Sequence, residues 1–228
     1  GLPARPGGRG AGAAAQRAVR EAGFPVGHVA QRAQLQGIAR RQHQPLAALG
    51  EAEKLVELPW GVAVPAWLPD GKGIVFATQV IPELAGSFAK ADLAAMKKEA
   101  KRRKDSKMTA YVTEDRRYRW FDRNLTDNLA NRLLKIDVAS KALTDLTPKH
   151  DRLFAPSGEV RFDIAPDGHH IALALNSTPP PYAEQPNTDI VLLPTDGTGT
   201  ATNLTTDNPY GDEFPRLAPD GRSGLYSR

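Results

Sequence analysis

The chain of 228 residues contains no cysteine. This absence excludes disulfide bridges, a thiol nucleophile and thiolate metal ligands. It does not fix the compartment, because proteins without disulfides occur both inside cells and outside them. A cytoplasmic and a periplasmic or exported location therefore both stay open.

Long apolar runs are also missing. No stretch approaches the ~20 apolar residues that a membrane-spanning helix needs. The first eight residues, Gly1 to Gly8, have no apolar core of the kind found in a signal peptide. The chain begins at Gly1 rather than Met, which indicates a fragment or a processed product. We expect no membrane partner.

The larger part of the chain lacks an excess of charge of either sign. Residues 58–228 hold 22 Lys/Arg and 22 Asp/Glu, so the sequence pI of about 9.4 comes from residues 1–57, with eight against four. We therefore expect no nucleic-acid partner. Residues 1–57 are poor in β-branched residues and predict an irregular or weakly helical segment. A flexible tail, a small helical appendage and sequence foreign to the following domain remain alternatives.

Motifs that carry chemistry are absent as well. None of the seven serines lies in a Gly-x-Ser-x-Gly elbow, and no glycine pattern is suited to cradle a phosphate. The five histidines form no ligand set, because His169 and His170 are neighbours on an expected strand and point to opposite faces. We predict no catalytic residue, no cofactor and no metal site in this chain.

What the sequence does contain is a turn that recurs three times. The copies are Leu68-Pro69-Asp70-Gly71, Ala165-Pro166-Asp167-Gly168 and Ala218-Pro219-Asp220-Gly221. Proline suits the second position of a type I turn, aspartate the third, and glycine the left-handed position that closes a hairpin. Because each aspartate serves its own turn, we interpret all three as structural residues rather than a carboxylate cluster.

A second hairpin lies between the turns and ends each time in Leu-Thr, at Leu146-Thr147 and Leu204-Thr205. Apolar residues alternate around the turns, as in strands with one buried face. The order strand, hairpin, Leu-Thr, strand, Pro-Asp-Gly, strand predicts a four-stranded blade. Asp167 and Asp220 are 53 residues apart, close to one propeller blade of ~40–50 residues. Residues 58–228 thus predict an all-β fold, a partial β-propeller of about three four-stranded blades with WD40-like or Tol-type repeats.

The first and second turns are separated by an insertion, at about residues 81–128. Within it, residues 88–107 predict a helix with eight Lys/Arg and three Asp/Glu. We interpret it as a solvated helix on a loop excursion. A nucleic-acid or membrane patch is less favoured, because few aromatics are interleaved and the apolar face is thin.

The segment Thr113–Asp122 is dense in charged and aromatic residues. One interpretation is strand and loop residues that pack between blades. The other is a rim that faces a central cavity, with Glu114, Arg117 and Arg119 as candidate contacts to the termini of a peptide substrate.

The combined series resembles the propeller of the prolyl oligopeptidase family of serine peptidases, and most closely its bacterial dipeptidyl-peptidase and acylaminoacyl-peptidase-like branch. The residues that carry the resemblance are Trp67–Lys72, Ile136–Val138, Asp145–Pro148, Phe162–Gly168, Asn187–Ile190, Asn203–Thr205 and Asp207–Arg216. The resemblance implies a C-terminal α/β-hydrolase domain with Ser, Asp and His, which the propeller caps so that only small peptides enter. The chain reaches Arg228 before any hydrolase sequence, so no catalytic residue is carried over.

Two functions follow as expectations. The first is the substrate-gating propeller fragment of such a peptidase, inactive in peptide hydrolysis by itself because a triad needs all its members in one geometry. The propeller and the hydrolase domain would bind the peptide substrate between them. The alternative is a non-catalytic propeller scaffold of the Tol type that binds protein partners. Open blade edges also predict self-association.

Overall fold

The computed structural model describes residues 53–107, 110, 112–113, 118–121, 123–125, 127–178, 186–198 and 200–228. The chain divides between Glu53 and Lys54, and the second unit, Lys54–Arg228, contains all the helices and strands reported below. Within the described ranges, no helix is both long and apolar enough to cross a membrane.

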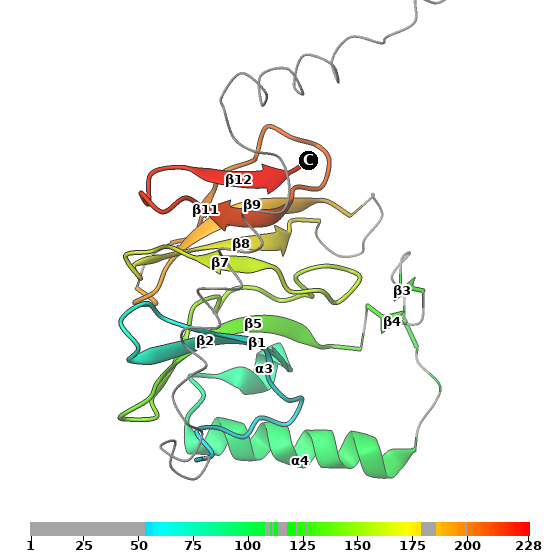
Figure 1. Ribbon diagram of the computed structural model, residues 1–228. Helices are drawn as coiled ribbons and strands as arrows, with labels where there is room; N and C mark the ends of the chain where they lie inside the picture. Colours follow the sequence, from blue (N-terminus) through cyan, green and yellow to red (C-terminus); the bar gives the residue numbers. More distant parts are fainter. Residues whose placement is uncertain are drawn as a thin grey trace, which may run out of the picture. The chain divides into compact units, whose positions relative to one another are not determined.

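The unit is mostly β, with antiparallel sheets and few helices (Figure 1). The first sheet has the order β1 (Ala63–Trp67), β2 (Gly73–Val80), β5 (Ala130–Asp137), β6 (Leu143–Asp145). The second has the order β7 (Phe162–Ile164), β8 (His170–Asn176), β9 (Thr188–Pro194), β10 (Thr202–Asn203). The third pairs β11 (Glu213–Leu217) with β12 (Gly224–Ser227), and a small sheet pairs β3 (Arg119–Trp120) with β4 (Arg123–Asn124).

The grouping of hairpins into sheets differs from the predicted blade. Each complete sheet begins with the Pro-Asp-Gly hairpin and ends with the Leu-Thr hairpin, whereas the sequence predicted the opposite order. β9 pairs with β8 over seven residue pairs, from His170 opposite Pro194 to Asn176 opposite Thr188. After Leu-Thr the chain leaves the sheet, because the threonine hydroxyl accepts the strand N–H that a further residue would have paired with. The described residues form two four-stranded sheets and one two-stranded sheet, and no closed ring is found among them.

The three Pro-Asp-Gly hairpins share one register. In each, the residue four before the turn aspartate lies opposite the residue five after it. These pairs are Ala66 with Val75, Asp163 with Ala172, and Arg216 with Leu225. A one-residue slip would turn every side chain of a strand to the other face, so this agreement places corresponding residues on corresponding faces.

The turns themselves have the same hydrogen bonds in all three copies. The glycine N–H donates to the carbonyl three residues earlier at 2.9 Å, and the aspartate Oδ1 accepts from the N–H two residues later at 2.8–2.9 Å. The glycines have φ of 70°, 74° and 66°, in the left-handed region where a Cβ would be strained. The structural role predicted for the three aspartates is confirmed by these bonds.

The Leu-Thr elements act as strand caps. Thr147 Oγ1 accepts the N–H of Leu133 at 2.9 Å, and Thr205 Oγ1 accepts the N–H of Ile190 at 3.0 Å. Both threonines are buried, so each hydroxyl satisfies a backbone donor that water does not reach. The side chain takes the place of a further strand residue, and the ladder stops there.

The first and second sheets pack face to face and enclose the main core. Its fully buried members come from both sheets and from the segment that joins them: Val75, Ala77, Leu133, Leu146, Phe154, Phe162, Ile171, Leu173, Val191 and Leu193. Ile171, Leu173 and Leu175 of β8 point into this core, as the alternation around the turns predicts. The opposite face of β8 is buried too, at Ala172 and Ala174, so the strand does not have the single buried face that was predicted. Two sheets stacked in this way bury one inner face each.

The opposite face of the first sheet is covered by two helices, α3 (Pro82–Ala85) and α4 (Lys90–Ser106). Met96 of α4 is fully buried against the sheet, and Leu93 packs beside it. Asp92 accepts the N–H of Ser87 and of Ala89 at 3.0 Å and so caps the start of α4. The helix predicted at residues 88–107 is confirmed within two residues at its start and one at its end. It is bound to a sheet along one side, and its other side is basic and exposed.

Candidate functional site

The predicted substrate rim is only partly within the described residues. Glu114 and Arg117 lie outside them, whereas Arg119 is exposed on β3. Trp120 beside it packs on Leu125 and Leu153, which ties the small β3–β4 sheet to the loop after β6. In Figure 1 this small sheet lies at the opposite end of the sheets from the three Pro-Asp-Gly turns. The assignment of these three residues to a substrate rim stays a prediction.

A buried polar cluster lies between the first sheet and the following loop. Arg132 is 4 % exposed, and its Nε lies 3.2 Å from Asp145 Oδ2. Neither Nε nor Nη1 of Arg132 makes a well-aligned hydrogen bond, and the same holds for Nε2 of His150. Burial lowers the pKa of Arg132 and raises that of Asp145, while each partner's charge opposes the shift. Two buried charges lose much of their hydration, and their mutual attraction must offset that loss. The presence of this ion pair therefore does not by itself show that it stabilises the fold.

Burial also changes the pKa of His150, a third titratable group in this cluster. Burial, with the charge of Arg152, lowers the pKa of His150 to about 4. Its ring centroid lies 5.0 Å from that of Phe154, which belongs to the main core. The imidazole of His150 is therefore neutral at pH 7. The sequence gives no sign of this environment, because no local pattern signals the burial of a loop residue.

Charged residues also connect the edge strands β7 and β11. Arg161, just before β7, forms ion pairs with Glu159 and with Glu213 of β11, and its guanidinium carbon lies 3.8 Å above the Phe214 ring. Asp163 of β7 accepts the N–H of Leu217 at 2.7 Å. The two strands are thereby held in register across the sheet boundary. Sequence reasoning missed this network, since its members are 52–54 residues apart.

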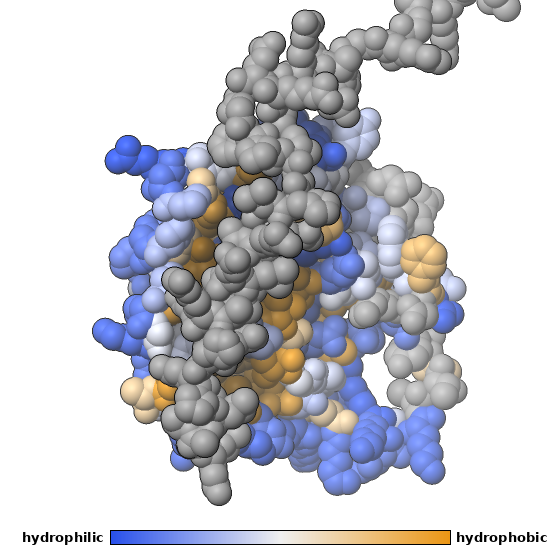
Figure 2. Space-filling model, viewed as in Figure 1, coloured by the Kyte–Doolittle hydropathy of each residue, from blue (hydrophilic) through white to orange (hydrophobic). Residues whose placement is uncertain are grey.

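The strands β1 and β11 each contain a β-bulge at the same position relative to their turns. Val64 and Phe214 both have positive φ, 49° and 56°, and each sits at the same distance from its turn aspartate. Both side chains are about half exposed. In Figure 2 apolar residues gather along the middle of the viewed face, while the end that carries the turns is hydrophilic. The bulge therefore turns apolar side chains outward at the sheet edge.

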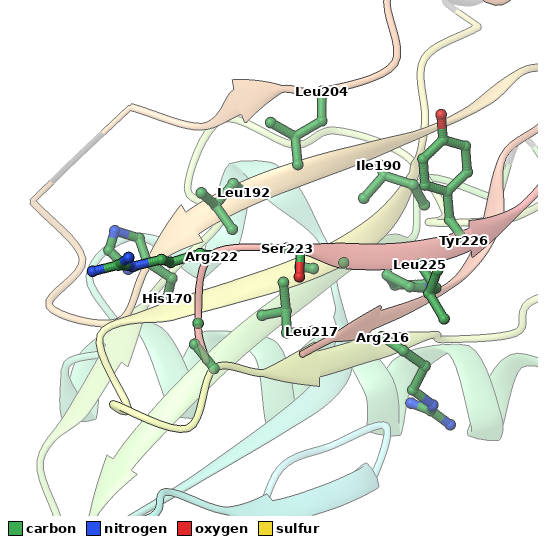
Figure 3. Close-up of a pocket in the computed structure, with 15 residues that line it drawn as sticks. His170, Ile190, Leu192, Leu204, Arg216, Leu217, Arg222, Ser223, Leu225 and Tyr226 are labelled. Atoms are coloured by element: carbon green, nitrogen blue, oxygen red, sulfur yellow. The ribbon is translucent and has the colours of Figure 1, made fainter. Parts of the chain in front are cut away.

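An apolar cleft of about 350 Å³ lies between the second sheet and the β11–β12 hairpin. Figure 3 shows Leu192 and Leu204 of the second sheet on one side of this space and Leu217 on the other. Tyr226 and Leu225 of β12 line its outer part. Within the described residues, β12 pairs only with β11, so its other edge borders the cleft without a strand.

The polar groups in the cleft do not form a catalytic set. His170 and Ser223 both line it, but no hydrogen bond joins these two side chains, and Ser223 Oγ lies 3.5 Å from Asp220. Both His169 and His170 are exposed. In the part of the chain that the structure describes, no group of three acidic or histidine side chains is placed to hold a metal ion. An apolar cleft beside an open strand edge is suited to bind an extended polypeptide.

Comparisons with known proteins show no family for this chain. No family model matches the chain, and no curated protein matches it. Among solved structures, a protein from Agrobacterium tumefaciens described as "putative TolB" is 19 % identical over 75 % of this chain, with a TM-score of 0.33. The chain spans 39 % of the length of that structure.

Proposed function

We propose that residues 58–228 form a segment of a β-propeller and act as a non-catalytic scaffold that binds polypeptide. The common register of three hairpins and the face-to-face stacking of two four-stranded sheets support the propeller. Each blade of such a fold is a four-stranded antiparallel sheet. The proposal treats the β11–β12 pair as the start of a further blade.

The observation that carries the binding role is the cleft beside β12. Apolar pockets along a cleft select the side chains of a bound polypeptide. Ile190, Leu192 and Leu204 provide such a lining here. A small-molecule site would instead be more enclosed and would present several convergent polar groups.

Binding and hydrolysis are tested on the purified full chain. We expect labelled extended peptides to bind saturably, with affinity that rises with their apolar content, in fluorescence anisotropy. We expect no hydrolysis of fluorogenic peptides and no labelling by a serine-directed fluorophosphonate. If no peptide binds, the scaffold role is wrong; serine-dependent hydrolysis would show that the chain is catalytic.

A second candidate is the substrate-gating propeller of a prolyl oligopeptidase-family serine peptidase. The sequence series quoted above favours it, as do the charged groups on the edge strands, where Arg161, Glu213 and Asp163 could contact the charged ends of a peptide. The catalytic residues would then belong to an α/β-hydrolase domain, because no serine of this chain has the elbow context.

The two candidates are separated by sequencing the locus on both sides of the segment that encodes this chain. A Gly-x-Ser-x-Gly elbow in the same frame downstream favours the peptidase. A stop codon after further blades, without such an elbow, favours the scaffold.

A further inference from the structure

The charges of helix α4 are unevenly distributed around its axis. One arc of the helix is exposed and turned away from the first sheet, since Met96 on the opposite side is fully buried. This basic arc contains a single carboxylate, that of Asp105. Its cations are Lys90, Lys97, Lys98, Lys101, Arg102 and Lys104. Eight cations against three carboxylates in residues 88–107 therefore become six against one on the exposed side.

Few of these cations are neutralised by ion pairs. Arg102 pairs with Glu99 on the flank of the helix, and Lys101 pairs with Asp105. Lys97 lies 3.8 Å from a glutamate that precedes β1. The cations that form no ion pair with any described residue are Lys90, Lys98 and Lys104. The basic arc therefore keeps most of its positive charge.

The basic arc is also held in a fixed position on its sheet. Met96 packs on the first sheet, and Arg103 Nη1 donates to the Asp127 carbonyl, just before β5, at 2.8 Å. Lys97, Lys101 and Lys104 follow one another at i, i+4 and i+7, so they form a row about 10 Å long. A row on an ordered backbone binds a complementary row with little further loss of conformational entropy.

The remainder of residues 58–228 has the opposite net charge. Outside residues 88–107 this region holds 14 Lys/Arg and 19 Asp/Glu, so its overall balance is the sum of a basic helix and an acidic remainder. An extended polyanion such as duplex DNA would be attracted by the helix and repelled by that remainder. No aromatic side chain on the basic arc is available to stack on the bases of a single strand. A nucleic acid is therefore a poor fit.

A membrane surface fits the basic arc poorly as well. The apolar side of an interfacial helix enters the lipid, whereas the apolar side of α4 is buried against the first sheet. A short acidic segment of a polypeptide touches the basic arc alone and is not subject to either objection. Residues 1–57 of this chain hold eight Lys/Arg against four Asp/Glu and do not have that character.

From this segregation of charge we propose that the basic arc of α4 binds an acidic segment of another polypeptide. Carboxylates along that segment lie opposite Lys97, Lys101 and Lys104. Each exposed ion pair contributes little, so the affinity comes from several pairs together and falls as salt rises. None of these lysines lines the cleft beside β12, so this inference goes beyond the polypeptide-binding role proposed above.

The probe for this surface is a labelled peptide of about twelve glutamates, with binding to the full 228-residue chain followed by fluorescence anisotropy. We expect saturable binding that weakens about tenfold between about 50 mM and about 200 mM salt. The triple variant Lys97→Glu, Lys101→Glu, Lys104→Glu should weaken binding at least about tenfold at the lower salt, because three attractions become repulsions. Absence of saturable binding to the native chain would overturn the proposal.

The matched control reverses three exposed lysines outside α4, in the variant Lys72→Glu, Lys141→Glu, Lys149→Glu. It changes the net charge of the chain by the same amount and should change the affinity less than about threefold. Equal losses in the two triple variants would mean that net charge, rather than the basic arc, determines binding, against the proposal.

A milder variant is used if the triple variant in α4 does not fold. Lys98→Gln with Lys104→Gln removes two charges and breaks no ion pair among the described residues. It should weaken binding about threefold, and an unchanged affinity would contradict the proposal.

Two further measurements identify the partner and the place of binding. Duplex DNA, or vesicles with anionic lipid, that bind the native chain more tightly than the glutamate peptide at equal salt would overturn the proposal. Leu204→Lys, in the cleft, should not weaken binding of the glutamate peptide. A loss in that variant, without a loss in the α4 triple variant, would place the acidic peptide in the cleft and overturn the inference.

Discussion

The two inter-sheet interfaces of this molecule start from equivalent residues and end differently. Between the first and second sheets, four strands meet four and the apolar side chains are fully enclosed. Between the second sheet and β11–β12, four strands meet two, and Leu204 stays half exposed. The difference shows that the second hairpin of a sheet, such as β9–β10, completes the burial, and that the Pro-Asp-Gly hairpin alone does not.

The largest expected effect compares the equivalent leucines. Leu146→Ala should destabilise the folded chain by about 3–4 kcal/mol, because a buried leucine leaves a cavity that only partly collapses. Leu204→Ala should cost less than about 1 kcal/mol, since its side chain is already half in water. Urea unfolding followed by tryptophan fluorescence measures both. Equal losses would mean that the cleft is closed in solution.

The next comparison concerns pH. His150 lies three residues after Thr147, and Asn208 lies three residues after Thr205. In both places the later residue's backbone N–H donates to the carbonyl of the threonine. The pKa of His150 is lowered in the folded state to about 4, so the unfolded chain binds this proton first as the pH falls. Stability should decrease from about pH 6.5 to pH 4, by at most about 3 kcal/mol, and this contribution should level off below.

The matching variant is His150→Asn, which places an asparagine after Thr147 as Asn208 stands after Thr205. It should remove that part of the pH dependence. The check is urea unfolding of both proteins at pH 7, 5 and 4. An unchanged slope between pH 6.5 and 4 would assign the acid sensitivity to other groups.

A smaller effect is expected to be the same at both interfaces. Thr147→Val and Thr205→Val each leave a buried backbone N–H without its acceptor, on Leu133 and Ile190 respectively. Each should cost about 1–2 kcal/mol. Similar losses in thermal or urea unfolding would confirm that the two sheets are built alike and differ only in their cover. A loss at one threonine alone would contradict this.

The smallest effect should come from the ion pair across β7 and β11. Arg161 and Glu213 are partly exposed, so water and salt screen their attraction. Glu213→Gln should change stability by less than about 1 kcal/mol, and even less at high salt. Glu159→Gln, which removes the other partner of Arg161, is the control. A loss well above that size would indicate that this network holds β11 in place.

The sequence predicted the elements of this fold better than their association. Pro-Asp-Gly turns and alternating apolar residues are local signals, and the strands around Asp70 and Asp167 were found within a few residues. Which hairpins share a sheet is a non-local property. The assignment of the Leu-Thr hairpin to the following turn was wrong, because the proline-rich connection between β8 and β9 signals a loop but not which strands pair across it.

The cleft itself could not be predicted from any motif. Its lining consists of ordinary strand residues such as Leu192 and Leu217, and it exists only because a two-stranded sheet lies on a four-stranded one. The Thr147 and Thr205 caps, by contrast, were visible as a repeated Leu-Thr. Their physical role became clear only from the N–H groups that they accept.

The position of α4 has a consequence for how such a stack is extended. With Met96 and Leu93 seated on the first sheet, one terminal face is closed by a helix, while the other ends in an open strand edge. In a linear array of repeats, terminal caps of this kind stop addition of further units. In the described stack, α4 therefore occupies the face of the first sheet on which a further sheet would otherwise pack.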